Sequence, residues 1–223
     1  MNTRRFVIPD IHGCEQTFRR LLENVIRLQK DDSLYLLGDF IDRGPRSKEV
    51  IDAIRQLQMD GYDILAIRGN HEEMFLKSCN DWSYFHLWMM NGGYTTLKSF
   101  GVEDACEIPF PYRTFIESFP YLIKLDDFVL VHAGLNFSAP DPFVDTEAML
   151  WSREREVVKG LIGNRRVIGG HTPLTRKEIQ RNLKGDLIML DNGCVYKGEP
   201  GLGSLVALEL DSMTLYFQEN IDM

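Results

Sequence analysis

Four of the chain's five histidines come just after short apolar runs that are typical of buried strands. They are His12, His71, His132 and His171, and each has a glycine within two residues. A single histidine at a strand end is usually structural, whereas four at equivalent positions are difficult to assign to chance. We therefore expect these imidazoles to share a site. The fifth, His86, lies in an aromatic run, where we expect it to pack.

Oxygen donors accompany the histidines and complete a set that suits metal ions. The candidate ligands are Asp10, His12, Asp39, Asn70, His132 and His171. Carboxylate, amide and imidazole donors without a thiolate suit Mn²⁺, Fe, Zn²⁺ or Ni²⁺ better than Ca²⁺, which prefers oxygen alone. Six ligands are too many for one open ion. They fit two divalent ions roughly 3.5–4 Å apart, an arrangement that serves in-line phosphoryl displacement.

The segment from Gly38 to Gly44 carries two further polar groups, Asp42 and Arg43, shortly after the candidate ligand Asp39. Both can point into the same cleft from one loop. A guanidinium offers two parallel N–H groups to phosphate oxygens, so Arg43 is a candidate phosphate-binding residue. A surface turn with an exposed ion pair is an equally good interpretation of these two residues taken alone.

Strands and helices that alternate along the chain must position these groups. Strand-like runs cover residues 6–8, 34–37, 64–67, 128–131 and 167–168, and helical patterns cover 18–28 and 50–57. Further strands are expected at 187–190, 205–210 and 215–217. Such alternation predicts an α/β sheet, with function in the loops beyond the carboxyl ends of the strands.

Residues 72–120 have a different character, with aromatic and methionine side chains at helical spacing. They predict either a helical cap beside the site or ordinary amphipathic helices packed on the sheet. We expect the 223 residues to form one domain, since that length is ordinary for a single core.

Charge and cysteine usage narrow the class of protein. The net charge of −8 argues against a nucleic-acid partner or an anionic membrane surface. No apolar stretch has the ~20 residues of a membrane span. The four cysteines form no CxxC pair, which favours reduced thiols. Because no signal peptide precedes the first strand-like run, we expect a cytoplasmic protein.

Five motifs together resemble those of the phosphoprotein phosphatase family, within the calcineurin-like metallophosphoesterases. They occupy residues 10–13, 38–44, 69–72, 132–134 and 170–172, in the family's order. Any one of them alone is weak, but the ordered set is specific. The resemblance implies a metallophosphoesterase-type β-sandwich of mixed sheets flanked by helices, with a small helical cap.

The resemblance also implies how the metal ligands are shared. Asp10, His12 and Asp39 would hold one ion. Asp39, Asn70, His132 and His171 would hold the other, with Asp39 as the bridge. The family's chemistry is attack on phosphorus by a metal-bridging hydroxide, and manganese is the metal that we expect first.

The remaining site residues receive roles from the same resemblance. His71 would be the general acid, oriented by Asp42. Arg43 would bind the phosphoryl group, together with Asn70 and His71. Arg153 follows a Trp-Ser pair where bacterial members supply a second phosphate-binding arginine. A solvated charge on a helix is an equally good interpretation of Arg153.

The chain departs from the family pattern in ways that leave the substrate open. Pro9 stands where a glycine is usual, so the backbone of the first metal loop is in doubt. The longer substrate-groove features of eukaryotic members are not recognisable. The segment from Trp88 to Gly93 resembles one shared with bacterial dinucleoside-polyphosphate hydrolases.

Three functions therefore stay open. The first is a serine/threonine protein phosphatase acting on a phosphorylated protein or peptide, with phosphotyrosine as a further substrate. It is favoured by Asp42, which the dinucleotide hydrolases usually replace. The second is a dinucleoside tetraphosphate hydrolase, whose adenine could stack on aromatic side chains of residues 82–100. The third is a metal-containing binding protein without turnover. The oligomeric state is left open.

Overall fold

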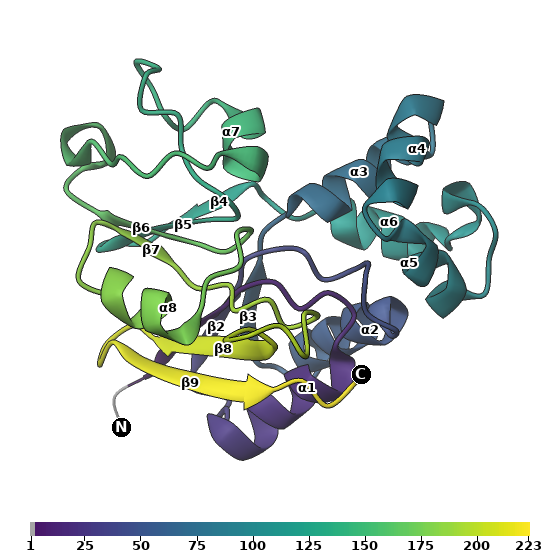
Figure 1. The fold of residues 1–223 in the computed structure, drawn as a ribbon, viewed down its shortest axis with the longest axis horizontal. Coiled ribbons are helices and arrows are strands. Elements are labelled where there is room, and N and C mark those ends of the chain that lie inside the picture. The colour runs from purple at the N-terminus through teal and green to yellow at the C-terminus, as the bar shows by residue number, and fades with distance from the viewer. Residues whose placement is uncertain (1–2) are drawn as a thin grey trace.

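The apolar runs of the sequence form the strands of two stacked β-sheets in the computed structural model, which describes residues 3–223 (Figure 1). The first sheet has the order β3-β2-β1-β8-β9. Its first three strands are parallel, with Phe6 opposite Leu34 and Leu34 opposite Ile64, and the last two run antiparallel. The strands are β1 (Arg5–Ile8), β2 (Ser33–Leu36), β3 (Asp63–Ala66), β8 (Ser204–Glu209) and β9 (Thr214–Glu219).

The second sheet has the order β4-β5-β6-β7. β5, β6 and β7 are parallel, and β4 pairs antiparallel with β5. These strands are β4 (Leu122–Lys124), β5 (Phe128–Val131), β6 (Arg166–Gly169) and β7 (Leu187–Met189). Two mixed sheets flanked by helices confirm the fold class that the motifs implied.

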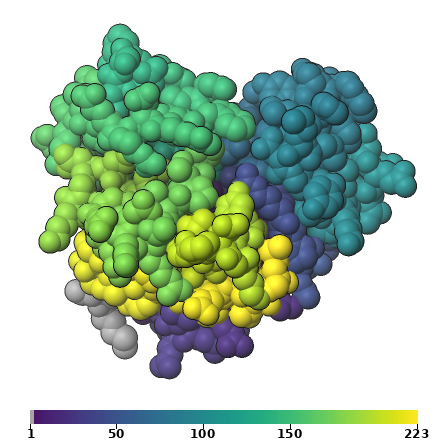
Figure 2. Space-filling view, viewed as in Figure 1, coloured from purple at the N-terminus to yellow at the C-terminus, as the bar shows by residue number. Residues whose placement is uncertain are grey.

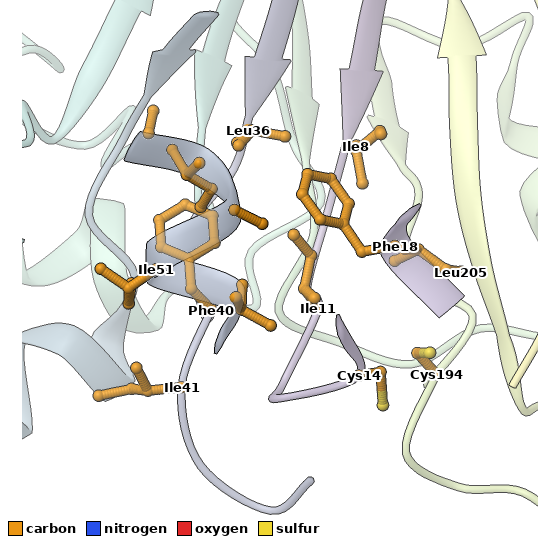
Figure 3. Close-up of a cluster of buried hydrophobic side chains, with 14 of the residues drawn as sticks. Ile8, Ile11, Cys14, Phe18, Leu36, Phe40, Ile41, Ile51, Cys194 and Leu205 are labelled. Atoms are coloured by element: carbon orange, nitrogen blue, oxygen red, sulfur yellow. The ribbon is translucent and has the colours of Figure 1, made fainter. Parts of the chain in front are cut away.

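Alternation along β1 divides the core into two layers. Phe6 and Ile8 belong to the cluster that packs against the helices, in which Figure 3 shows Ile8 beside Phe18 and Leu36. Val7 faces the opposite way, into the layer between the sheets. All three side chains are fully buried, which explains why the strand reads as a continuous apolar run.

Helices cover the outer faces of both sheets. α1 (Glu15–Arg20), the π-turn η1 (Leu21–Val25) and α2 (Ser47–Met59) lie over the first sheet (Figure 1). On the second sheet, Met149 of α7 (Thr146–Trp151) packs with Val129 and Val167. The remaining elements of this half are the 3-10 turn η3 (Lys159–Ile162) and α8 (Arg176–Asn182).

Residues 70–117 form a helical segment that stands beside the sheets, on the right in Figure 1. It contains α3 (Asn70–Ser78), α4 (Trp82–Met90), α5 (Gly93–Phe100), the 3-10 turn η2 (Ala105–Glu107) and α6 (Phe110–Glu117). Trp88 is its largest fully buried side chain. None of the helices within residues 3–223 is long and apolar enough to cross a bilayer. All four cysteines are free thiols.

Candidate metal centre

The predicted ligands come together because they follow parallel strands, whose carboxyl ends meet at one edge of the sandwich. The first sheet supplies them after β1, β2 and β3, and the second after β5 and β6. The six side chains are Asp10, His12, Asp39, Asn70, His132 and His171. All but His171 are buried, and His171 is half-buried.

Asp39 lies in the middle of this cluster. Its Oδ2 atom is 3.5 Å from Nε2 of His12 and 3.5 Å from Nε2 of His132. These two histidines come from different sheets, so one carboxylate oxygen faces donors on both sides. That is the position a bridging ligand needs.

Asn70 and His171 complete the side of the cluster that contains His132. Oδ1 of Asn70 is 2.9 Å from Nε2 of His132 and 3.2 Å from Nδ1 of His171. The two imidazole nitrogens are 3.2 Å apart. Carboxylate, amide and imidazole donors thus come together on this side of Asp39.

Asp10 is held by the backbone of the loop that follows β6. Both of its carboxylate oxygens lie 3.0 Å from the backbone N–H of His171, which donates to them. Donor atoms lie within 4.8 Å of one another in two groups that share Asp39, one with His12 and His71 and the other with His132 and His171. Burial, and then the charge of Asp191, raise the pKa of Asp10 well above its usual value.

The backbone hydrogen bonds of two histidines leave the lone pair of each ring on Nε2, which suits a cation. Nδ1 of His12 donates to the carbonyl of Ile41 at 2.8 Å, and Nδ1 of His132 donates to the carbonyl of Leu37 at 2.8 Å. Each Nε2 therefore carries a lone pair and lies 3.5 Å from Oδ2 of Asp39, and that of His12 accepts from the Arg43 guanidinium. Burial lowers the pKa of both imidazoles well below the usual value, so they are neutral. Lone pairs that face a carboxylate need a cation between them, and these donors fit divalent ions.

The loop after β2 is strained and is held by a buried carboxylate. Asp39, Asp42 and Arg43 have φ values of 53°, 72° and 67°, in the left-handed region that non-glycine residues rarely adopt. Glu72 accepts the backbone N–H groups of Asp39 and Phe40, each at 2.8 Å. A carboxylate that collects the loop's N–H groups compensates for this strain.

His71 and Asp42 form a buried pair beside the cluster. Nδ1 of His71 lies 2.6 Å from Oδ2 of Asp42, and neither side chain is exposed. The interpretation of Asp42 as part of an exposed surface ion pair is therefore wrong. Burial raises the pKa of Asp42 to about 7, although hydrogen bonds from Thr96 and Trp88 act in the opposite direction. Burial also lowers the pKa of His71 well below its usual value, which favours the neutral imidazole.

The two candidate phosphate-binding arginines differ in their settings. Arg43 is half-buried, and its guanidinium donates to Nε2 of His12 at 2.8 Å. Arg153 is exposed in the irregular stretch after α7, so it does not lie on a helix. Burial and then the charge of Arg153 lower the pKa of His171 to about 4, which places Arg153 near the cluster.

A cavity of about 360 Å³ opens beside Arg43, between the helical segment and the C-terminal part of the chain. Met90 and Tyr94 line one side, and Tyr196 and Met223 line the other. Figure 2 shows the surface hollowed where the helical segment meets the rest of the molecule. A larger cavity of about 540 Å³ lies beside α7. Of these two cavities, the smaller is the one that Arg43 lines.

Sequence reasoning missed several residues that support the site. It assigned no role to Asp191, which is buried and whose charge reaches Asp10. It assigned no role to Trp88 and Thr96, which both contact Asp42. The motif around His71 contained Glu72, but nothing in the sequence showed that its carboxylate reaches the loop after β2.

Comparisons with known proteins agree with the motifs. The family model described as calcineurin-like phosphoesterase matches residues 3–197. Serine/threonine-protein phosphatase 1 of Salmonella typhimurium is 32% identical over 204 residues, which cover 87% of this chain and 88% of that protein.

A further relative and a solved structure resemble this chain over different lengths. The symmetrical bis(5'-nucleosyl)-tetraphosphatase of Vibrio campbellii is 29% identical over 138 residues, 59% of this chain and 44% of that protein. A protein serine/threonine phosphatase structure from Saccharomyces cerevisiae superposes with a TM-score of 0.67 at 17% identity. The superposition covers 99% of this chain and 81% of that one. At that identity the superposition shows a shared fold only.

Proposed function

The chain belongs to the calcineurin-like phosphoesterase family, and from this premise we propose that it is a metal-dependent phosphomonoester hydrolase acting on phosphorylated serine and threonine side chains of proteins. The observation that carries the proposal is the buried His71–Asp42 pair, which lies against the cluster around Asp39. A metal site with a purely structural role does not require a buried histidine–aspartate pair beside it.

The donors support a site for two divalent ions that share Asp39. His12 lies on one side of Asp39, and Asn70, His132 and His171 lie on the other. We assign Asp10 to the group that contains His12, with its carboxylate held in place by the backbone N–H of His171. When bound, two such ions supply a nucleophile at neutral pH and neutralise charge on phosphoryl oxygens. We expect manganese first among the candidates.

Arg43 supports binding of the phosphoryl group. Its guanidinium is held at the cluster through His12, and the cavity beside it has room for the rest of the substrate. Asn70 and His71 lie deeper in the site, and Arg153 lies at its exposed margin. We propose that all four contact the phosphoryl group and that the helical segment forms a cap over one side of the cleft.

His71 is suited to protonate the leaving oxygen. Among residues 3–223, its Nε2 atom has no hydrogen-bond partner, and it lies 3.9 Å from Oδ2 of Asp39. The Nδ1 proton is held by Asp42. A doubly charged phosphoryl group beside Nε2 would favour protonation there. Serine and threonine leave as strongly basic alkoxides, so their departure depends on an acid more than that of a nucleotide phosphate does.

A second candidate function is hydrolysis of dinucleoside tetraphosphates. Tyr94 and Tyr196 face the cavity beside Arg43, and exposed aromatic rings can stack on bases. The Vibrio relative is named for that activity. The His71–Asp42 pair favours the first function, because a phosphate leaving group needs little help from an acid.

The deciding experiment compares turnover of a phosphoserine peptide, a phosphothreonine peptide and a dinucleoside tetraphosphate by the full chain with added Mn²⁺. We expect kcat/KM to be higher for the peptides, and activity to vanish when a chelator is added. A large preference for the dinucleotide would replace the first function with the second. Metal binding without turnover of any of these substrates would favour a binding protein.

A further inference from the structure

Three successive helices of the helical segment meet at one carboxylate, that of Asp42. His71 of α3 and Trp88 of α4 both donate to its Oδ2 atom, at 2.6 and 2.8 Å. The hydroxyl of Thr96, on α5, donates to Oδ1 at 2.6 Å. The same hydroxyl oxygen accepts the backbone N–H of Asp42 at 2.9 Å. Asp42 is fully buried, so these partners, and not water, determine where its oxygens point.

The indole N–H of Trp88 is directed at this carboxylate by close packing. The ring is fully buried, and the ring centroids of Phe75 and Phe85 lie 5.3 and 6.4 Å away. A Cβ atom on Gly93 would come within 2.6 Å of the Trp88 ring, so only glycine leaves room for the ring there. A tryptophan that served only to fill the core would not require its N–H to meet a carboxylate.

The turn that joins α4 to α5 completes this arrangement. Gly92 has a φ of 101°, and its carbonyl accepts the backbone N–H of Arg43 at 3.4 Å. A Cβ atom at this position would come within 3.0 Å of Cγ of Arg43. The segment from Trp88 to Thr96 therefore holds Asp42 and Arg43 together, although they belong to a different loop.

We propose that Trp88 is a positioning residue for the hydrolytic reaction and that Thr96 assists it. The two side chains hold the carboxylate of Asp42 in the one orientation that bonds Nδ1 of His71. This bond keeps Nε2 of His71 facing the cluster around Asp39. The inference rests on the proposed role of His71 as the acid. It adds that the helical segment determines how well this acid works.

The test compares two substrates that differ in their need for an acid. A phosphoserine peptide releases an alkoxide, whereas a nitrophenyl phosphate releases a stable phenolate that leaves without protonation. Trp88→Phe removes the N–H and keeps an aromatic ring. Thr96→Val removes the hydroxyl, and Thr96→Ser retains it. Phe75→Leu loosens the packing around Trp88 without removing a bond to Asp42 and serves as the matched control.

We expect Trp88→Phe and Thr96→Val each to lower kcat on the peptide by about tenfold and on the nitrophenyl ester by no more than about twofold. KM should stay constant, since neither residue touches substrate. Thr96→Ser should restore activity on the peptide. Phe75→Leu should lower the melting temperature while the ratio of the two activities stays as in the wild type. His71→Asn, as the reference, should show the same selectivity with a loss of roughly 10²-fold on the peptide.

Equal losses on both substrates in Trp88→Phe and Thr96→Val, while His71→Asn is selective for the peptide, would overturn the positioning role and leave the proposed function standing. Equal losses in His71→Asn as well would remove the acid and the positioning role together. A wild-type chain that hydrolyses the nitrophenyl ester and no peptide would contradict the proposed function itself, and the inference with it. Should Trp88→Phe fail to fold, Thr96→Val decides alone.

Discussion

Nδ1 of His71 lies 2.6 Å from Oδ2 of Asp42, with both side chains fully buried. The two residues come from different elements, since Asp42 lies in the loop after β2 and His71 lies in the first turn of α3. Their pairing links the loop that carries Asp39 and Arg43 to the helix that begins at Asn70. A histidine held in this way has one fixed ring orientation and one free nitrogen.

The pair should behave as a unit in a double-mutant cycle. We expect His71→Asn and Asp42→Asn each to lower kcat on a phosphoserine peptide by roughly 10²-fold. The double variant should be little worse than either single variant, because the second change removes a function that is already lost. Steady-state kinetics with saturating Mn²⁺ measure this. Losses that simply multiply would show that the two residues act independently.

Glu72 should be needed for stability and for metal binding. Its carboxylate accepts the N–H groups of Asp39, Phe40 and Gly69 at 2.8, 2.8 and 2.9 Å. Glu72→Ala leaves these buried donors without a partner, which should lower the free energy of unfolding by about 3 kcal/mol. Urea denaturation measures the loss.

The exposed Glu23 provides a control for that measurement, because Glu23→Gln should change stability by less than about 0.5 kcal/mol. Metal affinity of Glu72→Ala should fall too, since the loop carries Asp39. Unchanged stability and affinity would mean that the loop holds its strained shape without Glu72.

Gly170 should tolerate no side chain, because the molecule has no room for one beside Asp10. A Cβ atom there would come within 2.1 Å of Oδ2 of Asp10. Gly170→Ala should therefore displace Asp10 and weaken metal binding by roughly tenfold or more. Gly160→Ala is the control, since a Cβ at that position meets nothing within 4 Å. Isothermal titration calorimetry measures the Mn²⁺ affinity of both variants. Equal affinities would refute the expected displacement of Asp10.

An ion pair between Arg4 and Asp32 should make part of the stability depend on pH. The guanidinium donates to the carboxylate at 2.6 and 3.0 Å. Burial raises the pKa of Asp32, but the bonds from Arg4 and from the backbone of Gln29 outweigh it, and the net pKa lies below the usual value. A lowered pKa in the folded state means stability that is present above the unfolded pKa and is lost as pH falls through the folded pKa.

Asp32→Asn should accordingly lower the free energy of unfolding by about 1 kcal/mol at pH 7. The difference from the wild type should shrink as pH falls below about 4, near the unfolded pKa of aspartate. Urea unfolding at several pH values measures it. The exposed neighbour Asp31 provides a control, because Asp31→Asn removes a carboxylate and leaves the bonds between Arg4 and Asp32 in place. A constant difference across this range would show that the pair is not the cause.

The sequence predicted most of the fold because buried strands leave a plain apolar signature. The eight expected strands are present, with small differences at their ends. β4 was missed, since it has three residues and none of them is fully buried. The helix expected over 18–28 ends earlier, after a π-turn at Val25, and Arg27 takes a left-handed φ of 50°.

The helices α7 and α8 are too short for a periodic pattern, although capping signals were present. Asp145 caps α7, and Thr175 with Glu178 forms a capping box at the start of α8. Such signals could have located both helices.

The candidate ligands were accessible from the sequence because each follows a strand directly. The groups that orient these ligands could not be predicted from the sequence. Trp88 is 46 residues from Asp42, and Glu72 is 33 residues from Asp39. Contacts over such separations depend on how helices pack, and no local pattern encodes them. The same holds for Asp10, whose carboxylate is turned toward a backbone N–H from the other sheet.

Two divalent cations should bind this chain, one on either side of Asp39. Crystals grown with Mn²⁺ and measured near the manganese absorption edge would locate them directly. We predict two anomalous peaks that flank Oδ2 of Asp39, one next to His12 and the other next to His132 and His171. The peaks should be absent in Asp39→Ala. A single peak, or peaks remote from these side chains, would contradict the account.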